Sequence, residues 1–333
     1  MKAYRLHRYG GADAARLEQV ADPMLGARDL LVRTIGMGLN PVDYKTRDGM
    51  LKPVVKLSLP VTLGNELSGE VVAVGAAVTS FKPGDRIIAR VEKGRLGAFA
   101  ELACIDQSVA ALLPAAVDPV DASALPLAGL TALQALRDEL ATGPGKEVLI
   151  TAGAGGVGIF AIQIAKWLGA RVTTTASPRG EALVRELGAD EVIDYTTTDL
   201  TSTGRRFDHA FDLAGGDTLK ACFAVVRPGG TVLSVAGMPE PLTASKDLGR
   251  GFGLQALFWL ASFALRRRAA ANGVRYRYLF MHPSGAELAE LAALVDRGAI
   301  RIVIDSRFAL DDIANAIAHL ESGRAKGKIV VAI

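Results

Sequence analysis

The fold of this chain is decided by the stretch Glu147-Val148-Leu149-Ile150-Thr151-Ala152-Gly153-Ala154-Gly155-Gly156-Val157-Gly158. Its beginning reads as a short strand, and its glycines then follow the spacing G-x-G-x-x-G at 153, 155 and 158. That spacing is weak evidence by itself, but between a strand and a helix it predicts a loop that holds a dinucleotide. Glycines are needed there because side chains would keep a pyrophosphate away from the free N–H groups of the helix start. A tight turn without a ligand is the alternative interpretation.

From the strand before this loop onward, strands and helices alternate along the chain. A helix is predicted from Val157 to Leu168, and Gly169 ends it because glycine tolerates the left-handed backbone of a helix end. Further strands are predicted at 171–175, 191–194, 207–213, 231–236 and 274–280, and further helices at 181–187 and 218–226. Strands that alternate with helices form a parallel, doubly wound sheet, so the predicted class is α/β with a Rossmann-type domain.

The first third of the chain has a different texture. Short strand-like runs at 30–35, 69–74 and 87–90 are bounded by Gly, Pro and Asp, which predicts a β-rich, barrel-like domain. A helical segment at 121–140 leads into the alternating part. The tail has predicted helices at 286–296 and 311–320, a strand at 300–305, and a last strand at 328–333 that pairs back into the first domain. The predicted domains are therefore 1–122 with 282–333, and 123–281.

Composition and charge exclude several classes of protein. With 333 residues, 50% of them hydrophobic and 22% charged, the chain has the balance of a globular protein of two domains. A formal net charge of +3 without a basic footprint argues against a nucleic-acid partner. The two cysteines, Cys104 and Cys222, form no disulfide framework, and the charged N-terminal residues lack the apolar core of a signal peptide. We therefore expect a cytoplasmic protein.

The longest apolar run extends from Phe252 to Leu265. It is shorter than the roughly 18 to 20 residues that cross a bilayer. We interpret it as a buried or substrate-side helix rather than a membrane contact, so no membrane partner is predicted. The cluster Arg266-Arg267-Arg268 follows directly and is interpreted as a solvated helix end.

The end of the second predicted strand of the parallel sheet indicates which dinucleotide is bound. Sites that take NAD usually place an Asp or Glu about 20 residues after the glycine loop, where it binds the ribose 2′-hydroxyl. This chain has Ala176-Ser177-Pro178-Arg179 at that place. A hydroxyl and a guanidinium suit a 2′-phosphate, and no carboxylate is present to repel it. NADP(H) is therefore predicted, with NAD and a merely solvated Arg179 as the alternative.

Several further segments resemble the medium-chain dehydrogenase/reductase superfamily along nearly the whole chain. They occur in order at 38–43, 63–69, 126–132, 153–158, 192–195, 227–230 and 323–328. The closest resemblance is to the zinc-independent quinone oxidoreductase and enone reductase branch. It implies a chaperonin-10-like (GroES-like) catalytic domain formed by both chain ends, with a Rossmann NADP-binding domain inserted between them. The implied activity is NADPH-dependent reduction of a quinone or an α,β-unsaturated carbonyl compound.

The resemblance also assigns residues to parts of the cofactor. It implies that the pyrophosphate is held by Ala154, Gly155, Gly156 and Val157. It implies that the adenosine ribose and its phosphate lie beside Ser177 and Tyr195. The residues implied along the rest of the cofactor are Leu213, Gly215, Val235, Ala236, Phe280, Met281, Arg324, Ala325 and Lys326, with Asn40 and Thr131 near the nicotinamide. Arg179 is not a constant feature of the family, so its role rests on its chemistry alone.

Zinc-dependent members of the superfamily need donors that this chain lacks. Their pattern has a cysteine near position 38, a histidine where Asn65 stands, and a third ligand later. Of that pattern only Glu66 remains here, and the four histidines show no paired spacing. Four-coordinate zinc needs Cys, His or carboxylate donors in a tight set, so no metal is predicted.

The missing metal favours reduction of an activated double bond over oxidation of an alcohol. Alcohol oxidation without zinc needs a base for the hydroxyl proton, whereas hydride addition to an enone or quinone needs mainly positioning and a polarised carbonyl. Asn40 and Thr131 are the candidates at the nicotinamide, and Tyr44 and Lys45 are candidate donors to the developing oxyanion. The alternative for Asn40 is a capped turn, in which Asp43 fixes the loop.

Two other functions stay open at this point. Reduction of an enoyl thioester is the nearest enzymatic alternative. An NADPH-binding structural or regulatory protein with weak catalysis is the alternative from another class. A homodimer is also left open.

Overall fold

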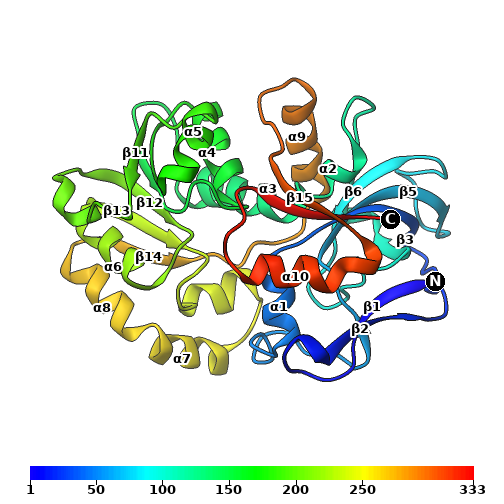
Figure 1. Cartoon of the computed structure of the whole chain (residues 1–333). Coiled ribbons are helices and arrows are strands. Elements are labelled where there is room, and N and C mark those ends of the chain that lie inside the picture. Colours follow the sequence, from blue (N-terminus) through cyan, green and yellow to red (C-terminus); the bar gives the residue numbers. More distant parts are fainter. The chain divides into compact units, whose positions relative to one another are not determined.

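The glycine loop follows a central strand of a six-stranded parallel sheet in the computed structural model, which describes residues 1–333 (Figure 1). The strand order is β11-β10-β9-β12-β13-β14. The strands are β9 (Glu147–Ile150), β10 (Arg171–Ala176), β11 (Glu191–Asp194), β12 (Phe207–Asp212), β13 (Val226–Ser234) and β14 (Arg275–Tyr278). The chain winds outward from β9 in one direction and from β12 in the other, so the predicted doubly wound sheet is confirmed.

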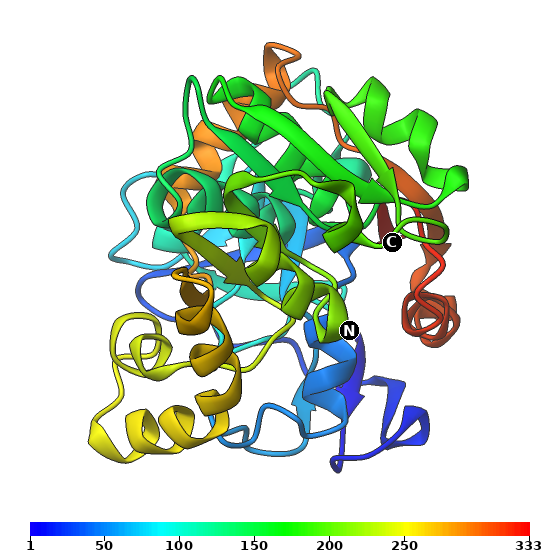
Figure 2. The ribbon, with the colours of Figure 1, turned by 90° about the vertical axis from the view of Figure 1, so that its left-hand side faces the viewer.

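Helices cover both faces of this sheet, whose strands fan out with the usual twist (Figure 2). Figure 1 shows α4 (Gly158–Trp167) and α5 (Pro178–Glu186) on one face, and α6 (Gly216–Val225) and α8 (Phe263–Ala271) on the other. Gly169, with a φ of +89°, follows α4 as predicted, because glycine adopts that backbone without strain. Coverage on both faces leaves Val148, Leu149 and Ile150 of the central strand β9 at 0% exposure.

The structure divides into two units, Met1–Leu130 with Pro283–Ile333, and Thr131–His282. The first boundary lies later than the predicted one after residue 122. The reason is the packing of α3 (Pro126–Leu133), whose first turn belongs with the terminal segments. The Leu127 N–H, for example, donates to the Glu66 carboxylate at 2.5 Å.

The helical segment predicted at 121–140 is interrupted. It consists of α2 (Pro119–Ala122), α3 and a π-helical turn at Gln134–Glu139. The strand predicted at 300–305 is also displaced, because the Ile300 N–H still donates to the Leu294 carbonyl at the end of the preceding helix, at 3.1 Å. The strand itself, β15, begins at Ile304.

The terminal segments build the β-rich unit. Its larger sheet has the order β15-β16-β3-β5-β6-β8 with β7 paired on β3, and its smaller sheet has the order β2-β1-β4. The strands are β1 (Lys2–Leu6), β2 (Ala15–Gln19), β3 (Asp29–Gly38), β4 (Val61–Thr62), β5 (Glu66–Val74), β6 (Arg86–Arg90), β7 (Leu102–Asp106), β8 (Ala110–Leu112), β15 (Ile304–Ala309) and β16 (Lys328–Ala332). Its further helices are α1 (Pro41–Arg47), α9 (Gly285–Asp296) and α10 (Ile313–Glu321). Because β16 pairs with β3, the predicted return of the last strand is confirmed.

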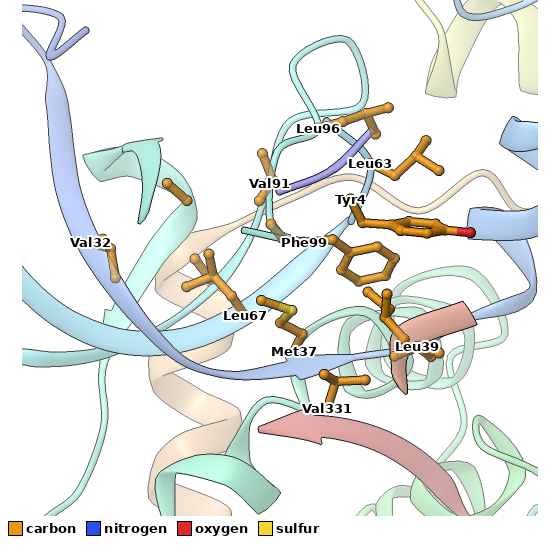
Figure 3. Packing of buried hydrophobic residues seen from close by; sticks show 14 of the residues in the cluster. Tyr4, Val32, Met37, Leu39, Leu63, Leu67, Val91, Leu96, Phe99 and Val331 are labelled. Atoms are coloured by element: carbon orange, nitrogen blue, oxygen red, sulfur yellow. The ribbon is translucent and has the colours of Figure 1, made fainter. Parts of the chain in front are cut away.

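One hydrophobic core joins the two ends of the chain in this unit (Figure 3). Tyr4 of β1, Met37 of β3, the following Leu39, and Phe99 are each at most 2% exposed. Val331 of β16 packs into the same cluster. Burying a large apolar side chain contributes about 1.5 to 3 kcal/mol, so the C-terminal strand helps to stabilise the same core as the N-terminal residues.

The apolar run at 252–265 differs from its prediction. It forms α7 (Phe252–Ala261) and the start of α8, but of its large apolar side chains only Phe258 is buried. Phe252 is 84% exposed and Leu260 is 67% exposed. The buried alternative of that prediction is wrong, because α8 packs beside β14, with Ala269 in the core, and α7 lies outside it. The substrate-side alternative stays a prediction. None of the helices combines the length and apolarity that crossing a membrane requires.

Candidate functional site

The glycine loop between β9 and α4 presents backbone rather than side chains. A Cβ on Gly153 would lie 2.1 Å from the Thr174 hydroxyl oxygen, and one on Gly158 would lie 2.4 Å from the Ala152 carbonyl oxygen. The first and third glycines are therefore required by the packing of the loop itself. A Cβ on Gly155 would meet only that same carbonyl, at 3.2 Å, so the second glycine leaves the outer side of the loop open. This division of roles is the one expected where a pyrophosphate approaches the backbone.

The middle of the loop offers hydrogen-bond donors. Ala154 is buried, whereas Gly155, Gly156 and Val157 are half-exposed. The N–H groups of Gly156 and Val157 have no acceptor within the chain. Free N–H groups at the start of a helix attract anions, so the predicted loop residues present the donors that a pyrophosphate needs.

Ser177, Arg179 and Tyr195 lie at the carboxyl ends of β10 and β11. The register pairs the last residues of these two strands, so Ser177 and Tyr195 follow neighbouring strands at one edge of the sheet. The Ser177 hydroxyl and the Arg179 guanidinium have no hydrogen-bond partner in the chain, and Tyr195 is 59% exposed. The carboxylate of Asp194 is occupied by the N–H of Thr196 at 2.9 Å and its hydroxyl at 2.7 Å. The edge therefore carries an unpaired positive charge.

The buried carboxylate of Asp212, which the sequence does not single out, ties the next strand ends together. It accepts hydrogen bonds from the hydroxyls of Thr151 at 3.0 Å and Ser234 at 2.8 Å, and from the Gly215 N–H at 3.1 Å. Thr151 in turn accepts the Leu213 N–H at 2.8 Å. Ser234 accepts the N–H of residue 236 at 3.0 Å. One side chain at the end of β12 thus holds the backbone of the predicted cofactor residues at 213–215 and 235–236.

Phe280 and Met281 follow β14, and a buried ion-pair cluster holds the backbone of Phe280. The Asp247 carboxylate accepts the Phe280 N–H at 2.9 Å and pairs with Arg277 at 2.6 Å. Arg277 also pairs with Glu139 at 3.0 Å. Burial acts to lower the pKa of Arg277, but hydrogen bonds to Glu139 and Asp247 outweigh it and raise that pKa above its usual value. The guanidinium therefore stays charged and fixes the segment that carries Phe280.

In the β-rich unit, Asn40 lies in a buried polar cluster. Lys328 Nζ donates to Asn40 Oδ1 at 2.5 Å, to Glu66 Oε1 at 2.8 Å and to the Leu39 carbonyl at 2.9 Å. Asn40 Nδ2 donates to the same Glu66 oxygen at 2.6 Å. Lys328, Glu66 and Asn40 are at most 3% exposed. The Asn40 amide is therefore held in one orientation, with one amide hydrogen left over.

Asp43 closes the turn that carries Asn40. Its carboxylate accepts the Asn40 N–H at 2.7 Å and Asn65 Nδ2 at 2.6 Å, so Asp43 fixes the loop as predicted. Burial raises the pKa of Asp43 to about 6, against the opposing effect of these two hydrogen bonds. Arg90 donates to the Asn65 carbonyl at 3.2 Å, and burial lowers the pKa of its guanidinium to about 10.

The remaining candidates lie in three places. Tyr44 and Lys45 are half-buried on α1, and the Tyr44 hydroxyl has no hydrogen-bond partner in the chain. Burial raises the pKa of that phenol. Thr131 is buried in α3 and belongs to the unit of the parallel sheet, and Arg324, Ala325 and Lys326 form the loop between α10 and β16. Asn40 therefore caps the start of α1, the helix that carries Tyr44 and Lys45.

Comparison with known proteins identifies the family. Residues 26–115 match the family model of the alcohol dehydrogenase GroES-like domain, and residues 187–331 match that of the zinc-binding dehydrogenases. The chain is 32% identical to the NAD(P)H oxidoreductase RTN4IP1, mitochondrial, of Danio rerio, over 100% of its own length and 91% of that protein. The chain belongs to the medium-chain dehydrogenase/reductase superfamily.

Two further members of the superfamily show the branch. The chain is 32% identical to the NADPH-dependent alkenal/one oxidoreductase, chloroplastic, of Arabidopsis thaliana, covering 99% of this chain and 79% of that one. The structure of Escherichia coli quinone oxidoreductase complexed with NADPH matches with a TM-score of 0.83 and 26% identity, covering 100% of both chains. These matches confirm the predicted quinone oxidoreductase and enone reductase branch, and with it the GroES-like and Rossmann-type domains.

The zinc-binding pattern of the superfamily finds no matching donors here. A Cβ on Gly38, near which that pattern has a cysteine, would lie 2.2 Å from Glu66 Oε1 and 2.4 Å from the Ser123 carbonyl oxygen. Asn65, at the histidine position, donates its amide within the polar cluster, and Glu66 Oε1 already accepts from Lys328. No group of three His, Cys, Asp or Glu side chains comes together as a metal site. The residues present do not fit a zinc ion.

Proposed function

We propose that the protein is an NADPH-dependent oxidoreductase that transfers hydride to a quinone or an α,β-unsaturated carbonyl compound without zinc. The observation that carries the proposal lies at the carboxyl edge of the parallel sheet. The open glycine loop follows β9, and Ser177 and Arg179, whose side chains have no hydrogen-bond partner in the chain, follow the neighbouring strand β10. The substrate class follows the relatives, of which one is a quinone oxidoreductase and another an alkenal/one oxidoreductase.

The residues at the sheet edge fit the parts of NADPH, which supplies the hydride when bound. The open N–H groups at Gly156 and Val157 suit the pyrophosphate. A guanidinium and hydroxyls suit the 2′-phosphate, because charge-assisted hydrogen bonds are stronger than neutral ones. The residues proposed to line the rest of the cofactor are Leu213, Gly215, Val235, Ala236, Phe280, Met281, Arg324, Ala325 and Lys326.

Asn40 is proposed to donate its remaining amide hydrogen to the nicotinamide carboxamide or to the substrate oxygen. Lys328 and Glu66 orient the amide before any ligand arrives. A donor that is already oriented stabilises the charge that develops on an oxygen without reorganisation during the reaction. Tyr44, whose hydroxyl has no partner, and Lys45 are the candidates to deliver a proton to that oxygen. Thr131 is retained as a further candidate at the nicotinamide.

NADPH oxidation by the full chain tests this function, with a small quinone, a conjugated alkenal and an enoyl thioester as separate acceptors. We expect turnover with the quinone or the alkenal. Gly155→Val serves as the matched variant, because a branched side chain would fill the open side of the loop and abolish NADPH binding. Turnover with the thioester alone would replace the proposal by an enoyl-thioester reductase. Tight NADPH binding with no turnover of any acceptor would replace it by a binding protein.

A homodimer and a cytoplasmic location are proposed alongside this function. Light scattering of the purified chain tests the first, with a mass of one chain as the contradicting result. Fractionation of the source cells tests the second.

A further inference from the structure

An exposed apolar surface lies outside everything that the proposed function uses. Its members are Phe252, Leu257, Trp259, Leu260 and Phe263, which are between 47% and 84% exposed. They belong to α7 and the start of α8, the yellow helices that lie on the outside of their unit in Figures 1 and 2. Single exposed apolar side chains are common, but a group of large ones on adjoining turns marks an interaction surface. We refer to these residues, with Arg266, Arg267 and Arg268, as the α7–α8 surface.

The α7–α8 surface is held in place from beneath. Phe258 is 6% exposed, and the buried Ser262 hydroxyl donates to the Phe258 carbonyl at 2.7 Å where α7 meets α8. Ala269 of α8 packs in the core of the unit. Outside, the rings of Trp259 and Phe263 lie with centroids 5.7 Å apart. The two helices therefore present ordered aromatic side chains to solvent while only a few residues anchor them.

Arginines flank these apolar side chains along the sequence. Between Leu248 and Tyr276 the sequence contains no Asp or Glu, but it has arginines at 250, 266, 267, 268 and 275. None of these arginines forms an ion pair in the structure, and Asp217 of α6 is the one carboxylate with a resolved electrostatic effect from them, exerted by Arg268. Arg266 lies over the Trp259 ring, with 5.4 Å between the guanidinium carbon and the ring centroid. The surface is therefore both apolar and basic.

We propose that the α7–α8 surface docks the protein on an anionic phospholipid bilayer. In this arrangement the apolar side chains enter the region between headgroups and acyl chains, and the arginines bind lipid phosphates. Aromatic and leucine side chains beside arginines are the composition of helices that lie in a membrane interface. The 10 residues of α7 span about 15 Å, half of the roughly 30 Å of a hydrocarbon core, so the helix can lie in the interface but cannot cross it.

A second copy of this chain is a weaker candidate for the occupant. A symmetric contact through this surface would bring the same arginines of two copies together. An anionic bilayer instead complements the charge and takes up the apolar side chains. The proposal revises the predicted absence of a membrane partner, and it does not depend on the substrate or on the activity.

Vesicle binding by the full chain tests the proposal. Vesicles of phosphatidylcholine alone are compared with vesicles of equal parts phosphatidylcholine and phosphatidylglycerol in a sedimentation assay. The chain has two tryptophans, so Trp167→Phe leaves Trp259 as the single reporter. We expect the chain to sediment with the anionic vesicles only, more weakly at high salt, and the Trp259 emission to move to shorter wavelength.

Two pairs of variants separate the apolar from the charged contribution. Leu260→Asp should weaken partitioning by about tenfold or more, because a leucine loses its place in the bilayer. Met24→Asp is its control, since Met24 is 93% exposed in the other unit. Arg267→Gln and Arg268→Gln should each weaken partitioning about fivefold. Arg33→Gln, which removes an exposed and unpaired arginine of β3, should have no effect.

Three results would overturn the proposal. The first is absence of sedimentation with anionic vesicles. The second is binding that Leu260→Asp and the arginine variants leave at the wild-type level. The third is a dimer in solution that Leu260→Asp dissociates, without vesicle binding, which would identify a second copy as the occupant.

Discussion

Replacement of Lys328 by methionine should destabilise the β-rich unit more than the loss of any surface ion pair of the chain would. The ammonium donates to Asn40, Glu66 and the Leu39 carbonyl. Its removal leaves the Glu66 carboxylate buried at 0% exposure without its ion-pair partner, and only the Asn40 amide and the Leu127 N–H still donate to it. Breaking a buried ion pair from one side costs about 3 to 5 kcal/mol, because the remaining charge stays buried away from water without an opposite charge paired to it. Methionine keeps most of the volume of the lysine stem, so lost packing adds little.

The matched control is Lys82→Met. Lys82 pairs with Asp85 at 2.7 Å, a distance close to that of the buried pair, but its side chain is 80% exposed. Exposed pairs of this kind contribute about 0 to 1 kcal/mol, because solvent screens them and the long side chain loses freedom. The two variants therefore remove the same chemical group from sites that differ mainly in burial.

Hydrogen exchange followed by mass spectrometry measures the difference in stability between the two variants within the β-rich unit itself. Both tryptophans lie in the unit of the parallel sheet, at 167 and 259, so tryptophan fluorescence would not report on the β-rich unit. The amides of β3 and β16 do report on it, because these strands pair beside the cluster. We expect the free energy of opening there to fall by about 3 to 5 kcal/mol in Lys328→Met. The double variant with Glu66→Gln should recover part of this loss. An effect no larger than that of Lys82→Met would refute the role of burial.

Three further predictions follow from the site. The pKa of Asp43 is raised from 3.8 to about 6 in the folded chain, so the folded state keeps a proton that the unfolded state loses in this range. The wild-type chain should therefore lose roughly 3 kcal/mol of stability relative to Asp43→Asn as pH rises from about 4 to 6. Urea titrations of both chains at each pH measure this difference, and parallel stability curves would contradict it. Arg179→Ala should weaken NADPH binding about tenfold or more and leave NADH binding unchanged in fluorescence titrations. Elemental analysis should find no stoichiometric zinc, and a chelator should leave the activity intact, because Gly38 and Asn65 provide no zinc ligands. About one zinc per chain, with turnover lost on its removal, would contradict this prediction.

The sequence by itself determined the parallel sheet and the place of the glycine loop within it. The strand before Gly153 and the helix after Gly158 are set by local patterns, which are a run of apolar residues, a glycine spacing and an apolar helix face. The sequence also predicts that Ser177 and Tyr195 lie at the carboxyl edge of the sheet, since each residue directly follows a strand. Local patterns suffice because the ends of parallel strands meet at one edge whatever the rest of the chain does.

The polar cluster around Asn40 was decided by the tertiary structure alone. Lys328 reaches Asn40 across 288 residues, and a lysine in a final strand looks in the sequence like any solvated lysine. Asp212 is a similar case, because its partners Thr151 and Ser234 belong to different strands. Such contacts depend on which strands become neighbours, and no pattern along the chain encodes the distance between two side chains so far apart.

The exposure of α7 also required the tertiary structure. The apolar run correctly predicted a helix that is too short to cross a membrane. It could not tell a helix buried in a core from a helix exposed on the surface of the protein. An apolar side chain is removed from water both in a protein interior and in a lipid bilayer, so the sequence pattern is the same in the two cases. That choice was made by α8, which packs beside β14 and leaves α7 outside the core.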